Sequence, residues 1–229
     1  MTLHPIVCYY KCEQPDCDAT VTDVLAFMTA DREKDHHAVH AFTVEALAYL
    51  RSTRRSLVET VVQFTDGCSS QYKSKGPFTD VSDAASQYDC SHFERNFFGS
   101  RHGKGPADGE AAVVKEGCRK AIKAGEEISD STEMFNYLHS SHLHIQPSQT
   151  DHKHYRRSFF HINNINRERG PRATTVKGTR NFHCVTYVTP GVINTRNLSC
   201  YCDNCRQGLH RCHNESIVGP WNEVKLTKR

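Results

Sequence analysis

The stretch 61–118 constrains the fold of this chain most strongly. A β-branched run, VVQFT at 61–65, ends in Asp66-Gly67. This pattern predicts a buried strand whose end presents a carboxylate where the chain turns. A second strand is expected at 93–98, with the sequence FERNFF. Two strands with an acid at the end of the first indicate that a functional site lies at the carboxyl ends of these strands.

A loop rich in glycine and cations follows the second strand and contains His102 and Lys104. Pro106 then begins a helical run, with Asp108 and Glu110 in its first turn. Carboxylates brought together from different elements can hold Mg²⁺ or Mn²⁺, the hard cations of two-metal phosphodiester chemistry. Backbone N–H groups and cations of the loop would suit phosphate.

Each of these features also has a purely structural interpretation. Asp66-Gly67 is equally an ordinary turn that ends a strand. Asp108 and Glu110 are two residues apart on a helix, so both cannot face one site, and acids in a first turn complement the helix dipole. A basic glycine loop is often only a solvated loop. The residue types alone leave both interpretations open.

The composition favours a protein that is neither secreted nor membrane-bound. Among the 229 residues 37% are hydrophobic, and the net charge of +3 is only weak support for a nucleic-acid partner. There is no stretch of roughly 18 apolar residues for a membrane span. The first residues, MTLHPIVCYYKC, lack the apolar run of a signal peptide. A nuclear or cytoplasmic location is therefore expected.

Eleven cysteines give the strongest metal signal. Four of them fall within thirteen residues: Cys200, Cys202, Cys205 and Cys212. Four soft ligands at this spacing predict a closed, structural Zn²⁺ site, and free thiols or disulfides are the alternatives. His210 or His213 would be able to replace one ligand. Three more cysteines near the N-terminus would add a second site or donate a ligand to the first: Cys8, Cys12 and Cys17.

The rest of the chain is expected to alternate strands and helices. A helix after Asp35 carries an apolar stripe that includes Val39, Phe42 and Leu50. Residues 67–79 are predicted to be a loop. The other expected elements are strands at 5–10, 19–28, 182–188 and 192–198, a strand around 159–162, and a helix at 130–140 capped by Ser129 or Asp130. Three parts are expected: a core at 1–141, a basic, loop-rich connection at 142–180, and a Cys-rich end at 181–229.

The strings TDGCSSQYKSKGPF and FFGSRHGKGPADG resemble a family of transposon-derived animal proteins. The C-terminal Cys-x-Cys-x-x-Cys pattern also fits that family. The resemblance implies an RNase H-like, DDE-type transposase core. It would make Asp66 the second catalytic acid and Asp108 the third, with Glu110 as the alternate. His102 and Lys104 would lie near the scissile phosphate, and Mg²⁺ or Mn²⁺ would be the cofactor.

The first catalytic acid of such a core is missing from this chain. The family carries an Asp-Phe-x-Glu-Asn-Tyr string on its first strand, and no such string occurs here. The chain therefore resembles an N-terminally truncated copy. Asp23, in a strand-like run, is either a replacement ligand or lies at a solvent-facing sheet edge, and we favour the edge because a lone carboxylate is costly to bury.

These observations predict an α/β fold in which helices flank an RNase H-like mixed sheet, with a small zinc-binding segment at the C-terminal end. The expected function is DNA binding by a transposase-derived protein whose metal-dependent strand cleavage and transfer is incomplete. Whether the chain is an enzyme stays open. Cations expected on the DNA backbone are Lys73, Lys75, Lys104, Arg156, Arg157 and Lys177. The alternative is a zinc-stabilised DNA-binding or protein-interaction module without catalysis.

Overall fold

The computed structural model describes residues 1–54, 57–99, 105–146, 152–169, 175–206 and 212–226. It divides the chain into two compact units. Unit 1 gathers residues 1–34, 48–56 and 104–167, and unit 2 gathers 35–47, 57–103 and 168–229. Each unit is thus assembled from three separate segments of the chain.

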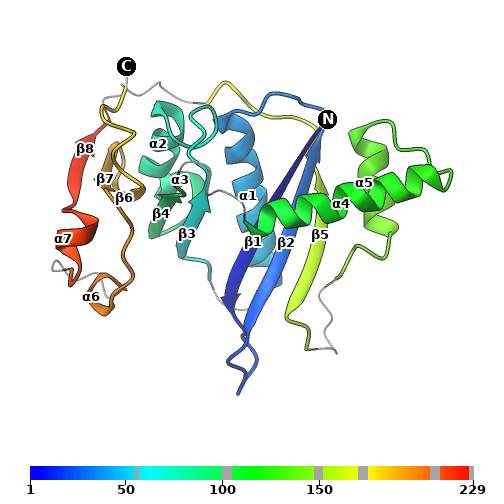
Figure 1. The fold of residues 1–229 in the computed structure, drawn as a ribbon, viewed down its shortest axis with the longest axis horizontal. Coiled ribbons are helices and arrows are strands. Elements are labelled where there is room, and N and C mark those ends of the chain that lie inside the picture. The colour runs from blue at the N-terminus through cyan, green and yellow to red at the C-terminus, as the bar shows by residue number, and fades with distance from the viewer. Residues whose placement is uncertain (55–56, 100–104, 147–151, 170–174, 207–211, 227–229) are drawn as a thin grey trace. The chain divides into compact units, whose positions relative to one another are not determined.

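Unit 1 is built on a three-stranded mixed sheet (Figure 1). The strands β1 (Thr2–Lys11) and β2 (Thr20–Thr29) form an antiparallel hairpin, and β5 (Tyr155–His161) pairs with β2 in parallel. The strand order is β1-β2-β5, so β2 is central. Its sequence, TVTDVLAFMT, is apolar without interruption from Val24 to Met28, and the strand is buried from Asp23 to Thr29, as expected for a strand that is covered on both faces.

Two helices cover one face of this sheet. The helix α4 (Pro106–Lys123) crosses β1 and β2, and α5 (Ser131–Ser140) packs against β5 and β2 (Figure 1). The core between them comprises Ala26, Met28, Val114, Cys118, Met134, Leu138 and Phe159. On the opposite face, Phe160 stacks on Phe27 and meets the ring edge of Tyr49 from the end of helix α1 (His36–Thr53).

Unit 2 contains a five-stranded sheet of order β3-β4-β6-β7-β8. The strands β3 (Thr60–Thr65) and β4 (His92–Phe97) are parallel, and the remaining pairs are antiparallel. The other three strands are β6 (Cys184–Thr189), β7 (Val192–Arg196) and β8 (Asn222–Lys225). Of the described helices, four belong wholly to this unit: α2 (Lys75–Ser82), α3 (Ala84–Tyr88), α6 (Asp203–Arg206) and α7 (Glu215–Val218).

Aromatic contacts hold α2 and α3 against the sheet of unit 2. Phe78 of α2 meets the rings of Phe97 and Phe182, and Tyr88 of α3 stacks on Phe93 at 5.0 Å between ring centres. The first part of α1, residues 36–47, belongs to the same unit. Its buried stripe includes Val39 and Phe42, in agreement with the helical spacing in the sequence.

The α/β class and the flanking helices are as predicted, but the described strands form two sheets rather than one. The strand at 61–65 was expected to be buried, and that prediction is wrong. β3 is an edge strand in the described sheet, and Val62 and Phe64 are 42% and 50% exposed. A run of β-branched residues indicates a strand. Whether that strand is buried depends on the elements that pack against it, and the run does not specify those elements.

Two further local predictions are also corrected. The loop expected at 67–79 ends early, because α2 begins at Lys75 and carries Pro77 in its first turn. Proline is tolerated there since its missing N–H would have no partner in the helix. Asp23 is not at a sheet edge: it lies on central β2, is fully buried, accepts a hydrogen bond from Tyr10 Oη and faces Arg156. These partners offset the cost that made burial seem unfavourable.

Candidate metal centres and nucleic-acid contacts

Four cysteines of unit 2 converge on one point at the end of the chain. Cys200 and Cys202 lie between β7 and α6, Cys205 lies on α6, and Cys212 precedes α7. Their Sγ atoms all lie within 4.8 Å of one another. Zinc–sulfur bonds of about 2.3 Å place the corners of a tetrahedron about 3.8 Å apart. The predicted group of four thiols is thus assembled as a site that can hold a metal ion such as zinc.

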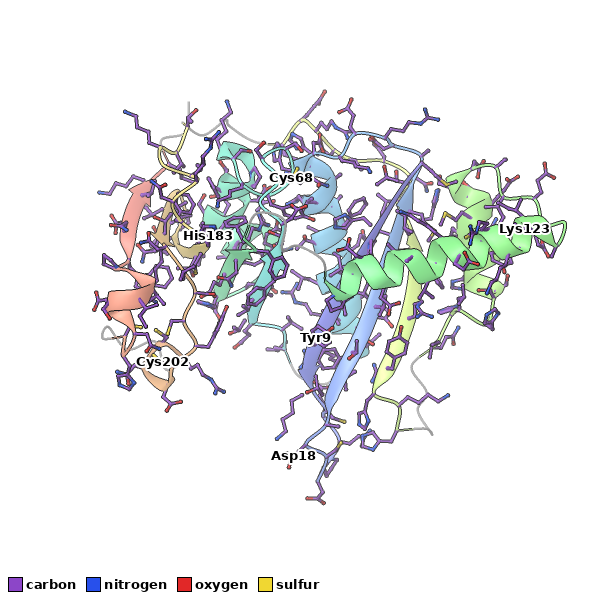
Figure 2. The ribbon with its side chains drawn as sticks, viewed as in Figure 1. Tyr9, Asp18, Cys68, Lys123, His183 and Cys202 are labelled. Atoms are coloured by element: carbon purple, nitrogen blue, oxygen red, sulfur yellow. The ribbon has the colours of Figure 1, made fainter. Side chains whose placement is uncertain are left out.

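Hydrogen bonds to sulfur surround this group, which we call the four-cysteine cluster. Arg196 Nη1 lies 3.6 Å from Cys205 Sγ, and Asn214 donates from its backbone N to Cys212 Sγ at 3.3 Å and from Nδ2 to Cys200 Sγ at 3.4 Å. The Asn214 side-chain hydrogen bond lowers the pKa of the Cys200 thiol. Such bonds favour the thiolate form and orient metal ligands. Figure 2 labels Cys202 in this segment.

The two histidines offered as replacement ligands have different outcomes. His213 is exposed and is not a member of the converging group. His210 lies outside the described residues. All eleven cysteines lie within the described residues, and none of them forms a disulfide.

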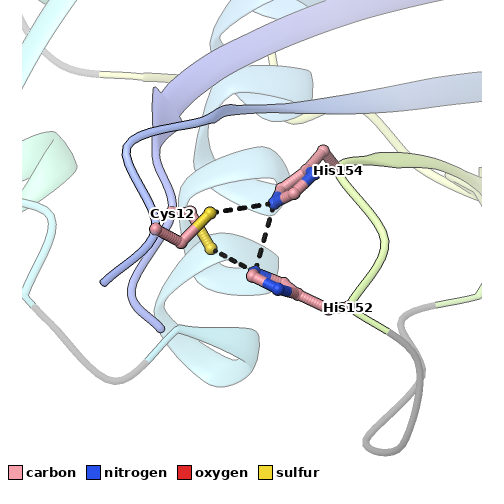
Figure 3. Close-up of side chains that lie close together, drawn as sticks. Cys12, His152 and His154 are labelled. Atoms are coloured by element: carbon pink, nitrogen blue, oxygen red, sulfur yellow. Dashed lines mark hydrogen bonds between the residues drawn. The ribbon is translucent and has the colours of Figure 1, made fainter. Parts of the chain in front are cut away.

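A second group of metal-ligand type lies in unit 1. Cys12 and Cys17 come from the turn between β1 and β2, and His152 and His154 immediately precede β5. One ligand atom from each lies within 4.8 Å of the others. Figure 3 shows the imidazole rings directed toward the two sulfur atoms. A hydrogen bond with His152 lowers the pKa of the Cys12 thiol to about 6.

Sequence reasoning identified only half of this group, which we call the cysteine–histidine cluster. Cys12 and Cys17 were candidates, whereas His152 and His154 were two among 15 histidines. The available signal was the paired spacing, Cys-x₄-Cys and His-x-His, in segments some 140 residues apart. Cys8, the third N-terminal candidate, is not in the cluster, and burial raises its pKa to about 12.

Two of the three candidate catalytic acids, Asp66 and Asp108, accept a hydrogen bond from a nearby backbone N–H. Asp66 is exposed after β3, and its Oδ1 accepts a hydrogen bond from the backbone N of Cys68 at 2.9 Å. Asp108 is exposed in the first turn of α4, where its Oδ2 accepts from the backbone N of Gly105 at 3.1 Å. Asp66 belongs to unit 2 and Asp108 to unit 1, so their predicted approach stays a prediction.

Glu110 forms a side-chain network within unit 1. Its Oε2 accepts from Arg157 Nε at 3.0 Å and Nη2 at 2.9 Å, and its Oε1 accepts from Tyr155 Oη at 2.9 Å. Arg157 is 7% exposed. This ion pair joins α4 to β5, which is a structural use of both side chains.

The remaining candidate nucleic-acid contacts differ in accessibility. Lys75 and Lys177 are exposed. Lys73 is half-buried with its Nζ 4.8 Å from the ring centre of Phe97, and burial lowers its pKa. Arg156 is partly buried and faces Asp23 at 3.7 Å. His102 and Lys104 lie outside the described residues.

The two motifs that carry the family resemblance begin at the carboxyl ends of two neighbouring strands in unit 2. The parallel strands β3 and β4 end together, and Phe98 N donates to Thr65 O at 2.9 Å. The ring of Phe64 stacks on Phe98 at 5.9 Å and lies 6.2 Å from Tyr201. Tyr201 is anchored by its Oη, which donates to Glu94 at 2.7 Å.

Comparison with known proteins yields one family. The model of a domain of unknown function, DUF8701, matches residues 1–199. The matched region contains the cysteine–histidine cluster and ends one residue before Cys200. No curated protein and no solved structure matches the chain. None of the described helices has the length and apolarity that crossing a bilayer requires.

Proposed function

We propose that this chain, which belongs to the DUF8701 family, is a transposase-derived DNA-binding protein. Its ancestral core would be RNase H-like and of the DDE type, and its ancestral activity would be metal-dependent cleavage and transfer of DNA strands. In the present chain that activity is incomplete. Structural zinc in the four-cysteine cluster would hold the C-terminal segment in place.

One observation carries this proposal: the TDG and FFGS motifs start side by side, at the carboxyl ends of β3 and β4. Phe98 N donates to Thr65 O, immediately before Asp66. In α/β sheets, ligands are bound beyond the carboxyl ends of parallel strands, because the loops that leave these strands meet there. A nucleic-acid strand would therefore be expected to bind at the carboxyl ends of β3 and β4.

Aromatic rings beside these strand ends support a nucleic-acid partner. Phe64, Phe98 and Tyr201 are 50%, 37% and 45% exposed. Exposed rings on a sheet offer stacking surfaces for bases, worth roughly 1–3 kcal/mol per base. The exposed cations Lys75 and Lys177 of the same unit would supply phosphate contacts.

The acids argue against cleavage by this chain. Asp66 is exposed, but Glu110 is occupied by Arg157 and Tyr155. Asp23, the upstream acid, is buried between Tyr10 and Arg156 and so does not fit a catalytic metal ligand. Two-metal catalysis needs several free carboxylates around the ions. Within either unit the described residues show no group of three or more converging carboxylates, and we derive no Mg²⁺- or Mn²⁺-dependent step.

Binding is tested by fluorescence anisotropy with labelled duplex and single-stranded DNA at about 50 and 200 mM salt. Each lost phosphate contact should reduce the salt slope by about 1, so the double change Lys75→Gln and Lys177→Gln should reduce it by about 2. The matched control is Lys123→Gln, an exposed cation of unit 1. Affinity that neither salt nor the double change alters would contradict the proposal.

Cleavage is tested with supercoiled plasmid in the presence of Mg²⁺ or Mn²⁺. The expected result is no nicking by the 229-residue chain. Robust nicking by the chain itself, abolished by Asp66→Asn, would show that the active site is complete.

A protein-interaction module is the second candidate, because β3 is an edge strand with an exposed, apolar row. Such an edge can accept a strand from another protein. Two substitutions separate the candidates. Val62→Lys should block strand addition and leave base stacking intact, whereas Phe64→Ser should weaken nucleic-acid binding. If Phe64→Ser leaves nucleic-acid affinity unchanged and Val62→Lys abolishes a protein complex, the interaction module is correct.

A further inference from the structure

The turn of the β1–β2 hairpin and the start of β5 must meet at one end of the sheet in unit 1. Lys11 pairs with Thr20 where the antiparallel hairpin closes, and Thr22 pairs with Tyr155 where β5 begins. Parallel neighbours start at the same end of a sheet, and an antiparallel strand finishes there. Topology thus brings the hairpin turn, at the tip marked by Asp18 in Figure 2, close to the residues before β5.

Backbone hydrogen bonds fix both segments at this end. Cys12 N donates to Ala19 O at 2.9 Å and closes the turn, and Cys17 N donates to Gln14 O at 3.3 Å. Thr22 N donates to His154 O at 2.7 Å, which ties the residue before β5 to the start of β2. The side chains are therefore presented from backbone positions that the sheet itself determines.

We infer that Cys12, Cys17, His152 and His154 form a second, closed Zn²⁺ site. Cys12 Sγ lies 2.9 Å from His152 Nε2, Cys17 Sγ lies 3.3 Å from His154 Nε2, and the two Nε2 atoms are 3.1 Å apart (Figure 3). The edges of a zinc tetrahedron with sulfur and nitrogen ligands are about 3.3–3.8 Å. These three distances need to lengthen by roughly 0.2–0.7 Å to admit the ion.

The ligand types favour zinc over the hard cations Mg²⁺ and Ca²⁺. Two thiolates and two imidazoles suit Zn²⁺, whereas Mg²⁺ and Ca²⁺ require oxygen ligands. Four protein ligands complete the tetrahedron, so the site has no open position for water and is structural rather than catalytic. Both rings present the same atom, Nε2, to the centre, which leaves each Nδ1 available for an outer partner.

A zinc ion bound at this site would be a long-range cross-link within unit 1. It would join residues 12–17 to residues 152–154 across roughly 140 positions of the chain. Metal affinity then becomes folding free energy for the sheet, because the site does not exist in the unfolded chain. β5 carries Arg156 and Arg157, which form ion pairs with β2 and α4. By holding the start of β5 in place, the zinc ion would also stabilise both ion pairs.

The test is zinc content and ligand type in the purified full chain. Elemental analysis should find about two zinc ions per chain. The double change Cys12→Ser and Cys17→Ser should leave about one, and the pair Cys200→Ser and Cys202→Ser should also leave about one. Matched controls are Cys68→Ser and His142→Gln, which lie outside both clusters and should keep about two.

X-ray absorption of the unmodified chain makes the test independent of variants that fail to fold. Two occupied sites should give an average of about three sulfur ligands and one nitrogen ligand per zinc. The Cys200→Ser, Cys202→Ser variant should give about two of each. One zinc per unmodified chain with sulfur ligands alone would overturn the inference, as would two zinc ions retained after both Cys12 and Cys17 are replaced.

Discussion

The two clusters of metal-ligand type differ in how far apart their ligands lie in the chain. The four-cysteine cluster takes all its ligands from residues 200–212, whereas the cysteine–histidine cluster joins a hairpin turn to residues about 140 positions later. A local site stabilises the loop that contains it. A long-range site stabilises the strands that must pair before its ligands can meet, because its formation requires the sheet to be in register. The same chemistry therefore has local consequences in unit 2 and unit-wide consequences in unit 1.

The largest expected effect is on the long-range cluster. Cys12→Ser with Cys17→Ser should destabilise unit 1 on the order of 3 kcal/mol or more, a large part of the usual 5–15 kcal/mol of a domain. Hydrogen exchange should quicken in β1, β2 and β5 together. The pair Cys200→Ser and Cys202→Ser should quicken exchange only between β7 and α7. Equal and local changes in both variants would remove the distinction between the clusters.

An intermediate effect is expected for two acids of α4, Glu110 and Asp108. They allow the same comparison of a long-range with a local interaction, without a metal ion. Glu110→Gln breaks a long-range, nearly buried pair with Arg157, at a cost of about 3 kcal/mol. Asp108→Asn affects only a contact with Gly105 three residues away, and should cost about 1 kcal/mol or less. Urea unfolding measures both variants. A larger loss from Asp108→Asn would show that Glu110 is not a structural residue.

The third effect does not appear at neutral pH, because it is the acid sensitivity of one partly buried histidine. Burial lowers the pKa of His4 in β1 from 6.5 to about 4. Between these values the unfolded chain binds the proton and the folded chain does not. The stabilising contribution is therefore complete above pH 6.5 and is lost as the pH falls toward 4, by about 2–3 kcal/mol.

The variant His4→Gln isolates this contribution. Its free energy of unfolding should depend less steeply on pH between about 6 and 4.5, by up to roughly 1.4 kcal/mol per pH unit. Protonation of the metal ligands affects both proteins alike and cancels in the difference. His40→Gln is the matched change in unit 2, where burial lowers the pKa of His40 to about 3. Identical slopes for His4→Gln and the unmodified chain would contradict the prediction.

The sequence alone determined the features that depend on near neighbours. The helical stripe of α1, the Asp130 cap of α5 and the strands around 20–29 and 184–196 follow from periodicity and capping chemistry. Asp130 accepts hydrogen bonds from the backbone N of Thr132 and Glu133, as an N-cap should. The four-cysteine cluster was predictable for the same reason, since its ligands are close enough in the chain to meet without help from a distant segment.

Only the tertiary structure decided which strands are neighbours, and with that the surroundings of particular residues. Asp23 lies on a central strand because β5, from residue 155 onward, pairs with β2 on its free side. Phe64 and Val62 share one face of β3, and both side chains are exposed there. His152 and His154 meet Cys12 and Cys17 because β2 and β5 start at the same end of one sheet. Strand pairing joins residues far apart in the chain, and local propensity does not encode the partner.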